Sequence, residues 1–234
     1  MLKKLTVLLL SSILFMAQMA CNLRNEHTKE KAVKEFEGII TYHEISKSSD
    51  GFVNIDDTVQ LFYSHGNYVG IHSEASSAPH LVRDYYLKSQ ALRLLRFNTS
   101  DTLHQLNLNF PIEKLDSFKV KTINEKTLSR KCESIELKTS YPEKDSTTYT
   151  DFIFTFSRGY LNIDKDHFKN WNLGFFNKIV NESGAFYLKF KATHFDSTHK
   201  KILSSKSYEV ISVKEQPIDP KIFEIDTTLI KWAK

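Results

Sequence analysis

The residues that could carry out metal chemistry are few and widely spaced. The closest grouping is His194 and His199 with Asp196 between them, side chains that can bind a metal ion when they converge. They lie at the polar end of a strand-like segment, where such residues are typical of a solvated turn. We therefore predict no metal ligands here and no metal site in the chain.

Paired carboxylates, a second candidate for acid–base chemistry, occur at Asp56 and Asp57 and at Asp164 and Asp166. Both pairs fall in expected turns or helix caps, where short acidic side chains hydrogen-bond to the backbone. The sequence contains no G-x-S-x-G, H-E-x-x-H, G-x-G-x-x-G or G-x-x-x-x-G-K-[ST] motif. It predicts a protein that is not an enzyme, with no catalytic residues and no cofactor.

The chain has two cysteines, and the surroundings of the first, Cys21, predict a covalent modification. Residues 1–4 form a short basic head, residues 5–17 are almost entirely apolar, and the small residue Ala20 precedes the cysteine. This is the plan of a secretory signal peptide, and an apolar run of about 13 residues is too short to span a bilayer, which takes ~20. We expect residues 1–20 to be a cleaved signal peptide.

A cysteine directly after the small residue resembles a bacterial lipoprotein signal, in which the thiol is acylated and becomes the first residue of the mature chain. Gln18 stands three positions before the cysteine, where such signals usually carry an aliphatic residue. Each buried methylene contributes ~0.8 kcal/mol, so two or more acyl chains anchor a protein durably. The resemblance implies a lipidated Cys21 that holds the protein on a membrane. Asn22, which is not the aspartate linked to inner-membrane retention, implies the outer membrane.

The rest of the chain divides into a short polar stretch and one long domain. Residues 21–35 carry charged and small polar side chains with little to bury, which predicts a tether. Residues 36–234 suffice for a single β-rich domain with a sizeable core. The net charge is only +4 and no basic cluster stands apart from acidic neighbours, so we expect no nucleic-acid partner. With Cys21 acylated, Cys132 has no disulfide partner; we expect it inside a strand, chemically quiet and pointing away from the main core.

Ten segments of the domain are rich in β-branched and aromatic residues and are separated by turn-forming residues. They predict a mainly β protein built on a single strongly curved antiparallel sheet of roughly eight to eleven strands. The segments are 36–45, 58–64, 66–74, 80–87, 91–97, 117–123, 132–139, 148–157, 185–195 and 207–213.

Two of these segments alternate with period two, so each has one face suited to the core. The large apolar faces consist of Phe152, Phe154 and Phe156 in the first segment and of Phe186, Leu188 and Phe190 in the second. The opposite faces carry Ile153 in the first and Tyr187 and Lys189 in the second. The five phenylalanines are candidates for lining a hydrophobic site.

One segment breaks the β pattern, because its apolar residues follow helical spacing: Phe168, Trp171, Phe175 and Ile179. Asp164 suits an N-cap and Gly174 weakens a helix, so we expect a short helix from Asp164 to about Trp171, followed by a loop. On the concave face of the sheet, this element either completes the core or forms a lid over an apolar cavity. The lid interpretation makes Phe168 and Trp171 further candidates for ligand contact.

The order of these segments resembles the GLPGLI group of envelope proteins and their lipoprotein relatives. The likeness rests on FEGIITYHEI (36–45), SRKCESIEL (129–137), TYTDFIF (148–154), HFKNWNLGFFNKIV (167–180) and KSYEVISVKEQPIDPKIFEI (206–225). Arg130 replaces the usual aromatic residue before Lys131 and Cys132, and WNLGFF lacks the proline of the eponymous motif. The resemblance implies a fold rather than an activity. The pattern is also similar to LolA and LolB, whose curved half-barrel sheet wraps an apolar cavity that carries lipoprotein acyl chains.

Two classes of function remain open on the sequence. In the first, a membrane-anchored lipoprotein binds a hydrophobic or lipid ligand in a cavity of the sheet. In the second, it is a structural or interaction lipoprotein that docks on an outer-membrane protein through a sheet edge or a loop face. A continuous apolar cavity would distinguish the first class from the second.

Overall fold

The computed structural model describes residues 34–73, 80–109, 113–144 and 146–232. From Glu35 onward these residues pack as one compact unit. The signal peptide, Cys21 and the tether up to residue 33 lie outside the described residues, so the predictions made for them stay predictions. Within the described ranges, no helix is long and apolar enough to cross a membrane.

One open sheet of twelve strands is the framework of the domain, in the order β12-β6-β5-β4-β3-β2-β1-β11-β10-β9-β8-β7. All neighbouring strands pair antiparallel except β12 and β6, which are parallel. The strands are β1 Gly38–Ser48, β2 Val53–Ser64, β3 Asn67–His72, β4 Leu81–Leu87, β5 Leu92–Phe97, β6 Leu103–Leu106, β7 Lys114–Thr127, β8 Arg130–Pro142, β9 Thr147–Phe156, β10 Lys189–Phe195, β11 Ile202–Glu215 and β12 Ile230–Lys231.

The expectation of a mainly β protein with a single sheet is confirmed, and each of the ten predicted segments overlaps a strand. The sheet departs from the expected roughly eight to eleven antiparallel strands only at β12, which pairs parallel with β6 and raises the number of strands to twelve. The two unpredicted strands, β6 and β12, are the shortest in the sheet. Period-two alternation cannot be recognised over so few residues.

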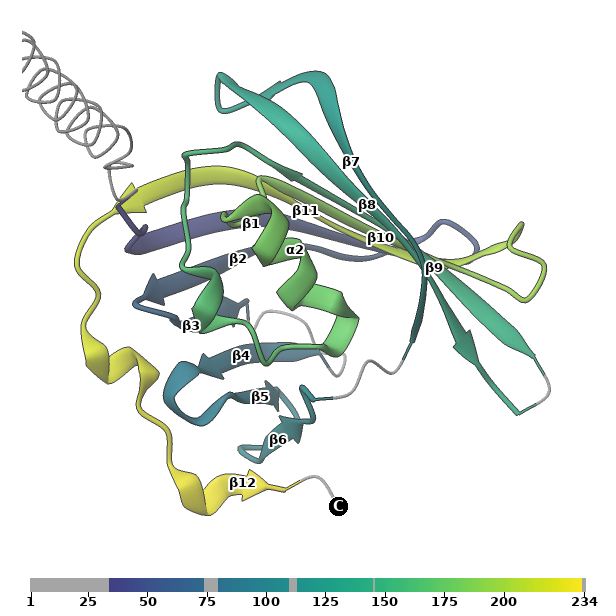
Figure 1. Ribbon diagram of the computed structural model, residues 1–234. Coiled ribbons are helices and arrows are strands. Elements are labelled where there is room, and N and C mark those ends of the chain that lie inside the picture. Colours follow the sequence, from purple (N-terminus) through teal and green to yellow (C-terminus); the bar gives the residue numbers. More distant parts are fainter. Residues whose placement is uncertain (1–33, 74–79, 110–112, 145, 233–234) are drawn as a thin grey trace, which may run out of the picture. The chain divides into compact units, whose positions relative to one another are not determined.

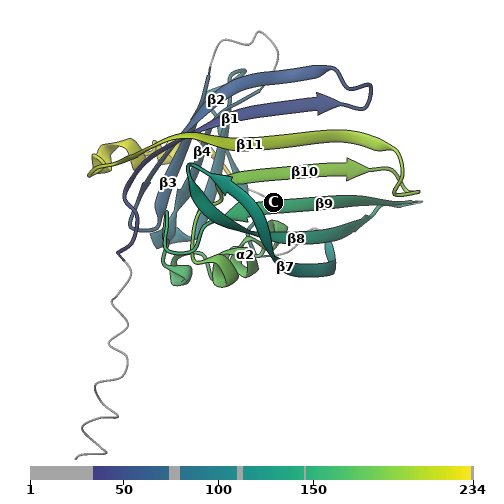
Figure 2. The same ribbon diagram turned by 90° about the horizontal axis from the view of Figure 1, so that it is seen from above.

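The sheet curves around the segment that connects β9 to β10, and helix α2 lies inside the curve (Figure 1). Seen from above, β1, β2 and β8 to β11 run on beyond α2 (Figure 2). The helical elements are the 3₁₀ turns η1 Lys88–Gln90, η2 Lys165–His167, η3 Leu173–Phe175, η4 Pro220–Phe223 and η5 Thr227–Leu229, and the α-helix α2 Phe176–Ser183.

The helix predicted from Asp164 to about Trp171 is wrong, because the α-helix begins only at Phe176. Asp164 does act as an N-cap, accepting the backbone N–H of Asp166, but the turn that it starts is the single 3₁₀ turn η2. The backbone N–H groups of Asn172 and Leu173 donate to the carbonyl of Leu108 rather than to a preceding helical turn.

The four residues of the predicted helical stripe are all buried, although only Ile179 belongs to α2. Gly174 and Phe175 both have positive φ, 60° and 56°, and this left-handed stretch separates the upstream chain from the helix. The spacing therefore predicted which residues face the sheet, although the chain that carries them is mostly irregular.

The alternation predicted for 185–192 also holds only in part, because β10 begins at Lys189. Before that residue the chain leaves the regular strand: Phe186 N–H donates to the carbonyl of Leu161, and Leu188 N–H to that of Thr155. As a result Phe186 and Tyr187, predicted to lie on opposite faces, both face the interior and line the same cavity.

Cys132 lies in β8 and is buried, as predicted. It does not point away from the main core, because it belongs to the largest hydrophobic cluster, whereas Ile135 and Leu137 of the same strand belong to a separate one. Cys132 occupies an even-numbered position of the strand, whereas Ile135 and Leu137 occupy odd-numbered ones. This difference in parity places Cys132 in a different cluster, not outside the core.

Candidate functional site

A cavity of about 350 Å³ lies between the inner face of the sheet and the segment that covers it. Residues of eight neighbouring strands, β5 to β1 and then β11 to β9, contribute to its floor, from Arg93 on one side to Phe152 on the other. Residues 171–176 and the chain before β10 form its roof. Strands distant in sequence therefore build one continuous site.

Aromatic side chains make up most of the walls. Of the seven residues proposed from the sequence as ligand contacts, five line the cavity: Phe152, Phe154, Trp171, Phe186 and Phe190. The other two, Phe156 and Phe168, are fully buried in the core beside it. Phe168 stacks on Tyr86, with ring centroids 5.1 Å apart, so its role is to support the roof.

Gly70 leaves a gap in the side chains of the cavity floor. It lies on β3 between Leu61 of β2 and Asp84 of β4. All seven glycines of the chain are described, and Gly70 is the only one without a positive φ. A Cβ added there would meet nothing closer than 3.7 Å. Neither backbone conformation nor tight packing requires glycine at this position, and its effect is to keep the cavity open.

An ion pair lies at the β4–β5 side of the cavity. Arg93 donates two hydrogen bonds to Asp84, Nε to Oδ1 at 3.0 Å and Nη2 to Oδ2 at 2.6 Å. This bidentate geometry is the strong form of the arginine–carboxylate pair. The guanidinium also lies 4.8 Å from the ring centroid of Trp171, which attaches the roof to the charged pair.

A second charged group, made of Glu44, His72 and Lys206, lies where β1, β3 and β11 meet the cavity. The carboxylate of Glu44 contacts His72 Nδ1 at 3.0 Å and Lys206 Nζ at 2.7 Å. Burial by itself raises the pKa of Glu44, but the hydrogen bonds from His72 and Lys206 and their charge outweigh it and lower the pKa to about 2. Glu44 is therefore ionised throughout the physiological range.

Tyrosine hydroxyls supply the remaining polar groups of the cavity. Burial raises the pKa of Tyr42, Tyr187 and Tyr208 above the ordinary tyrosine value, so all three stay protonated. Tyr42 donates to the backbone carbonyl of Tyr187 at 3.0 Å. These neutral groups add hydrogen-bonding capacity without adding charge.

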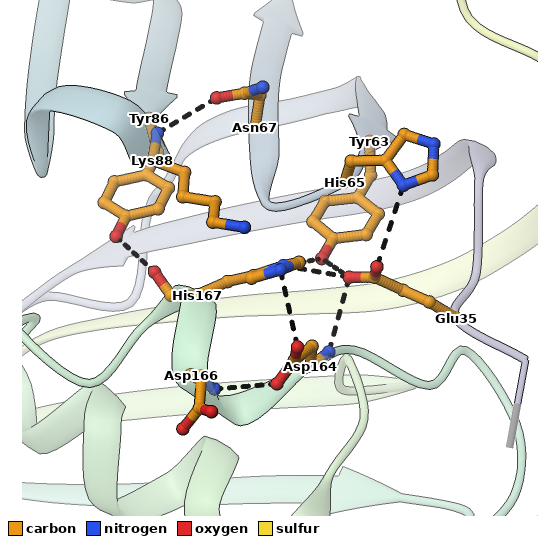
Figure 3. A network of polar contacts seen from close by, with 9 residues as sticks. All are labelled: Glu35, Tyr63, His65, Asn67, Tyr86, Lys88, Asp164, Asp166 and His167. Carbon is orange, nitrogen blue, oxygen red and sulfur yellow. Dashed lines mark hydrogen bonds and ion pairs between the residues drawn. The ribbon is translucent and has the colours of Figure 1, made fainter. Parts of the chain in front are cut away.

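A polar network holds the covering segment on the sheet (Figure 3). The carboxylate of Glu35 accepts hydrogen bonds from the hydroxyl of Tyr63 and, at 3.3 Å, from the backbone N–H of Asp164, and it contacts His167 Nδ1 at 3.0 Å. Tyr86 donates to the backbone carbonyl of His167 at 2.6 Å. Glu35, predicted as the end of a tether, thus lies within the folded unit and is bonded to the covering segment.

The turn between β2 and β3 comes close enough to this network to require a glycine. Gly66 has φ +88°, and a Cβ there would lie 2.6 Å from the imidazole of His167. The segment that covers the sheet is therefore fixed to it at His167.

The residues that could have carried chemistry stay apart. His194 contacts Thr150 Oγ1 at 2.9 Å, His199 contacts Asp151 at 3.2 Å, and Asp196 accepts backbone N–H groups of its own turn. Among the residues described, no group of three or more His, Cys, Asp or Glu side chains is arranged to hold a metal ion.

Asp56 and Asp57 lie in strand β2, so their predicted place in a turn is wrong. Asp56 contacts His43 Nε2 at 2.5 Å across the strand pair, and Asp57 accepts the backbone N–H of Thr58. Asp164 and Asp166 do occupy the predicted cap.

Sequence reasoning missed the charged residues of the cavity, and the strand periodicity contained a signal for them. Glu44 has the same parity as Ile40 and Tyr42 in β1, and Asp84 the same parity as Tyr86 in β4. A charged residue in phase with buried apolar ones is rare unless it is paired or functional. The partners could not be identified, because they lie on other strands.

Comparison with known proteins does not place the chain in a family: no protein-family model matches it, and no curated protein matches it significantly.

Proposed function

We propose that this protein is a membrane-anchored envelope lipoprotein, without enzymatic activity, that binds a small hydrophobic ligand in the cavity between its curved sheet and the covering segment. The observation that carries the proposal is the cavity itself, about 350 Å³ and walled mainly by aromatic side chains. Ligand sites typically occupy ~300–1,000 Å³ and combine apolar walls with a few polar groups. The half-barrel of LolA and LolB is the architectural analogue that we propose.

The polar groups of the cavity support binding over simple core packing. A packed core excludes voids larger than a water molecule and avoids charged side chains. Here the Arg93–Asp84 pair, together with Lys206, which is itself paired with Glu44 behind it, lines a space that aromatic rings leave unfilled. An apolar site with a few polar groups that fix orientation is the usual arrangement of a small-molecule site.

Filling the gap at Gly70 is expected to weaken ligand binding strongly. In Gly70→Leu the new side chain enters the cavity without a backbone clash, so binding of the neutral fluorescent probe N-phenyl-1-naphthylamine should fall by at least about tenfold, or ~1.4 kcal/mol. The melting temperature should not fall, because the leucine is buried among apolar groups. Gly70→Ala, which adds one methyl group, is the graded control. Wild-type probe affinity in Gly70→Leu would contradict the site.

Anchoring is tested separately through Cys21. The wild-type protein is expected in the detergent-extracted membrane fraction, whereas Cys21→Ala should be recovered in the soluble fraction, because it has no thiol to acylate. Cys132→Ala is the matched control and should stay with the membranes, since Cys132 is buried in the core. Recovery of Cys21→Ala in the membrane fraction would contradict the lipoprotein proposal.

A further inference from the structure

We infer that the cavity selects an uncharged amphiphile, an apolar chain or ring with a neutral hydrogen-bonding end such as an alcohol, and rejects both fatty-acid anions and organic cations. This inference rests on the proposed function, since it names the class of ligand for the same site. It is carried by the two charged groups of the cavity and by the aromatic faces that their cations occupy.

Anions are disfavoured because each cation of the cavity already has its own carboxylate. Arg93 is held by both oxygens of Asp84, and Lys206 lies 2.7 Å from Glu44. Each pair is neutral as a unit. A ligand carboxylate would bring a third negative charge into a largely desolvated site, and burying an uncompensated charge is costly.

Organic cations are disfavoured for the complementary reason. Aromatic cages bind ammonium groups through their ring faces, and this cavity is rich in such rings. Two of those faces are already covered by the cations of the protein itself. Arg93 lies 4.8 Å from the ring centroid of Trp171, and Lys206 lies 5.0 Å from that of Tyr208. A cationic ligand would be repelled by both.

A neutral polar end has hydrogen-bonding groups available to it. His72 lines the cavity, and its contact with Glu44 uses Nδ1 and not Nε2. A ligand hydroxyl both donates and accepts hydrogen bonds, so it can pair with this ring nitrogen. Asp84 takes Nε and Nη2 of Arg93, which leaves the Nη1 donors for the hydroxyl oxygen or a carbonyl.

The inference is tested with probes that share one chain and differ in charge. Dodecanol, dodecanoate and dodecyltrimethylammonium are titrated at pH 7.5, below micelle formation, with Trp171 fluorescence as the readout in a Trp232→Phe background. Dodecanol is expected to bind at least about tenfold more tightly than either charged probe, or ~1.4 kcal/mol. Dodecanoate or the ammonium probe binding equally or more tightly would overturn the inference but leave the proposed binding function standing. Failure of all three to bind would overturn both.

Removing one charge of a pair should reverse the selectivity. Glu44→Gln leaves Lys206 without its carboxylate, so the affinity for dodecanoate relative to dodecanol should rise by about tenfold. Lys206→Gln, whose side chain is 35% exposed, should instead raise the relative affinity for the ammonium probe. Glu136→Gln is the matched control, because it breaks the Lys121–Glu136 pair outside the cavity and should leave all ratios unchanged. Unchanged ratios in Lys206→Gln would also overturn the inference.

Discussion

Replacing Trp171 by alanine is expected to lower the free energy of unfolding by about 3–5 kcal/mol, the usual cost of truncating a buried tryptophan. The indole is 4% exposed and packs against Phe176, with ring centroids 4.7 Å apart, and against Tyr86 at 5.0 Å. It also covers the guanidinium of Arg93. If Trp171 were only part of a lid, its replacement would cost little stability. The packing in the structure predicts a large loss.

The measurement is urea unfolding followed by far-UV circular dichroism. The second tryptophan of the chain supplies the control, because Trp232 is 59% exposed and its replacement by alanine should change stability by less than about 0.5 kcal/mol. Equal stability of the two alanine variants would show that Trp171 is a detachable cover rather than part of the core.

Glu44 is expected to contribute about 3 kcal/mol of stability that depends on pH. Its pKa is lowered in the folded protein from 4.5 to about 2, so the folded state favours the ionised form. The contribution is therefore complete above the unfolded-state pKa and is lost as the pH falls from about 4.5 through about 2. Urea unfolding of the wild type and of Glu44→Gln, compared between pH 7 and pH 2, measures it.

The difference in stability between wild type and Glu44→Gln should be large at pH 7 and shrink towards pH 2. Glu136→Gln again serves as control, since the Lys121–Glu136 pair is largely solvated and contributes little, about 0–1 kcal/mol. A pH-independent difference for Glu44→Gln would show that the residue acts through packing and not through its charge.

The strands could be predicted from the sequence because buried apolar residues recur at every second position of a strand. In β9, Phe154 and Phe156 are buried and Ile153 is 40% exposed, as the alternation requires. The order of the strands could not be predicted, since it depends on which edges meet in space. Nothing in the local sequence of β1 indicates that its second neighbour is β11.

The candidate site was only half predictable, for the same reason. Large aromatic residues such as Phe152 and Trp171 can be recognised in the sequence by their size and spacing. The strand periodicity marks Glu44 as a charged residue in phase with buried ones, but it does not identify Lys206 as its partner, which is separated from it by most of the domain. The helix was misplaced because Asn172 and Leu173 bond to Leu108, a tertiary contact that outweighs the helical spacing of the apolar residues.

The pairing of β1 with β11 also determines when the chain can fold. Across the sheet, Ile40 has one partner nearby in sequence, Leu61, and another, Val213, that is synthesised much later. Until β11 is available, β1 and β10 each expose an edge of unpaired backbone N–H and C=O groups, which can pair with a wrong strand. Contacts between such distant segments also slow folding. The central sheet therefore cannot be completed before β11 has been synthesised, and the unfinished chain is the stage most exposed to aggregation and proteolysis.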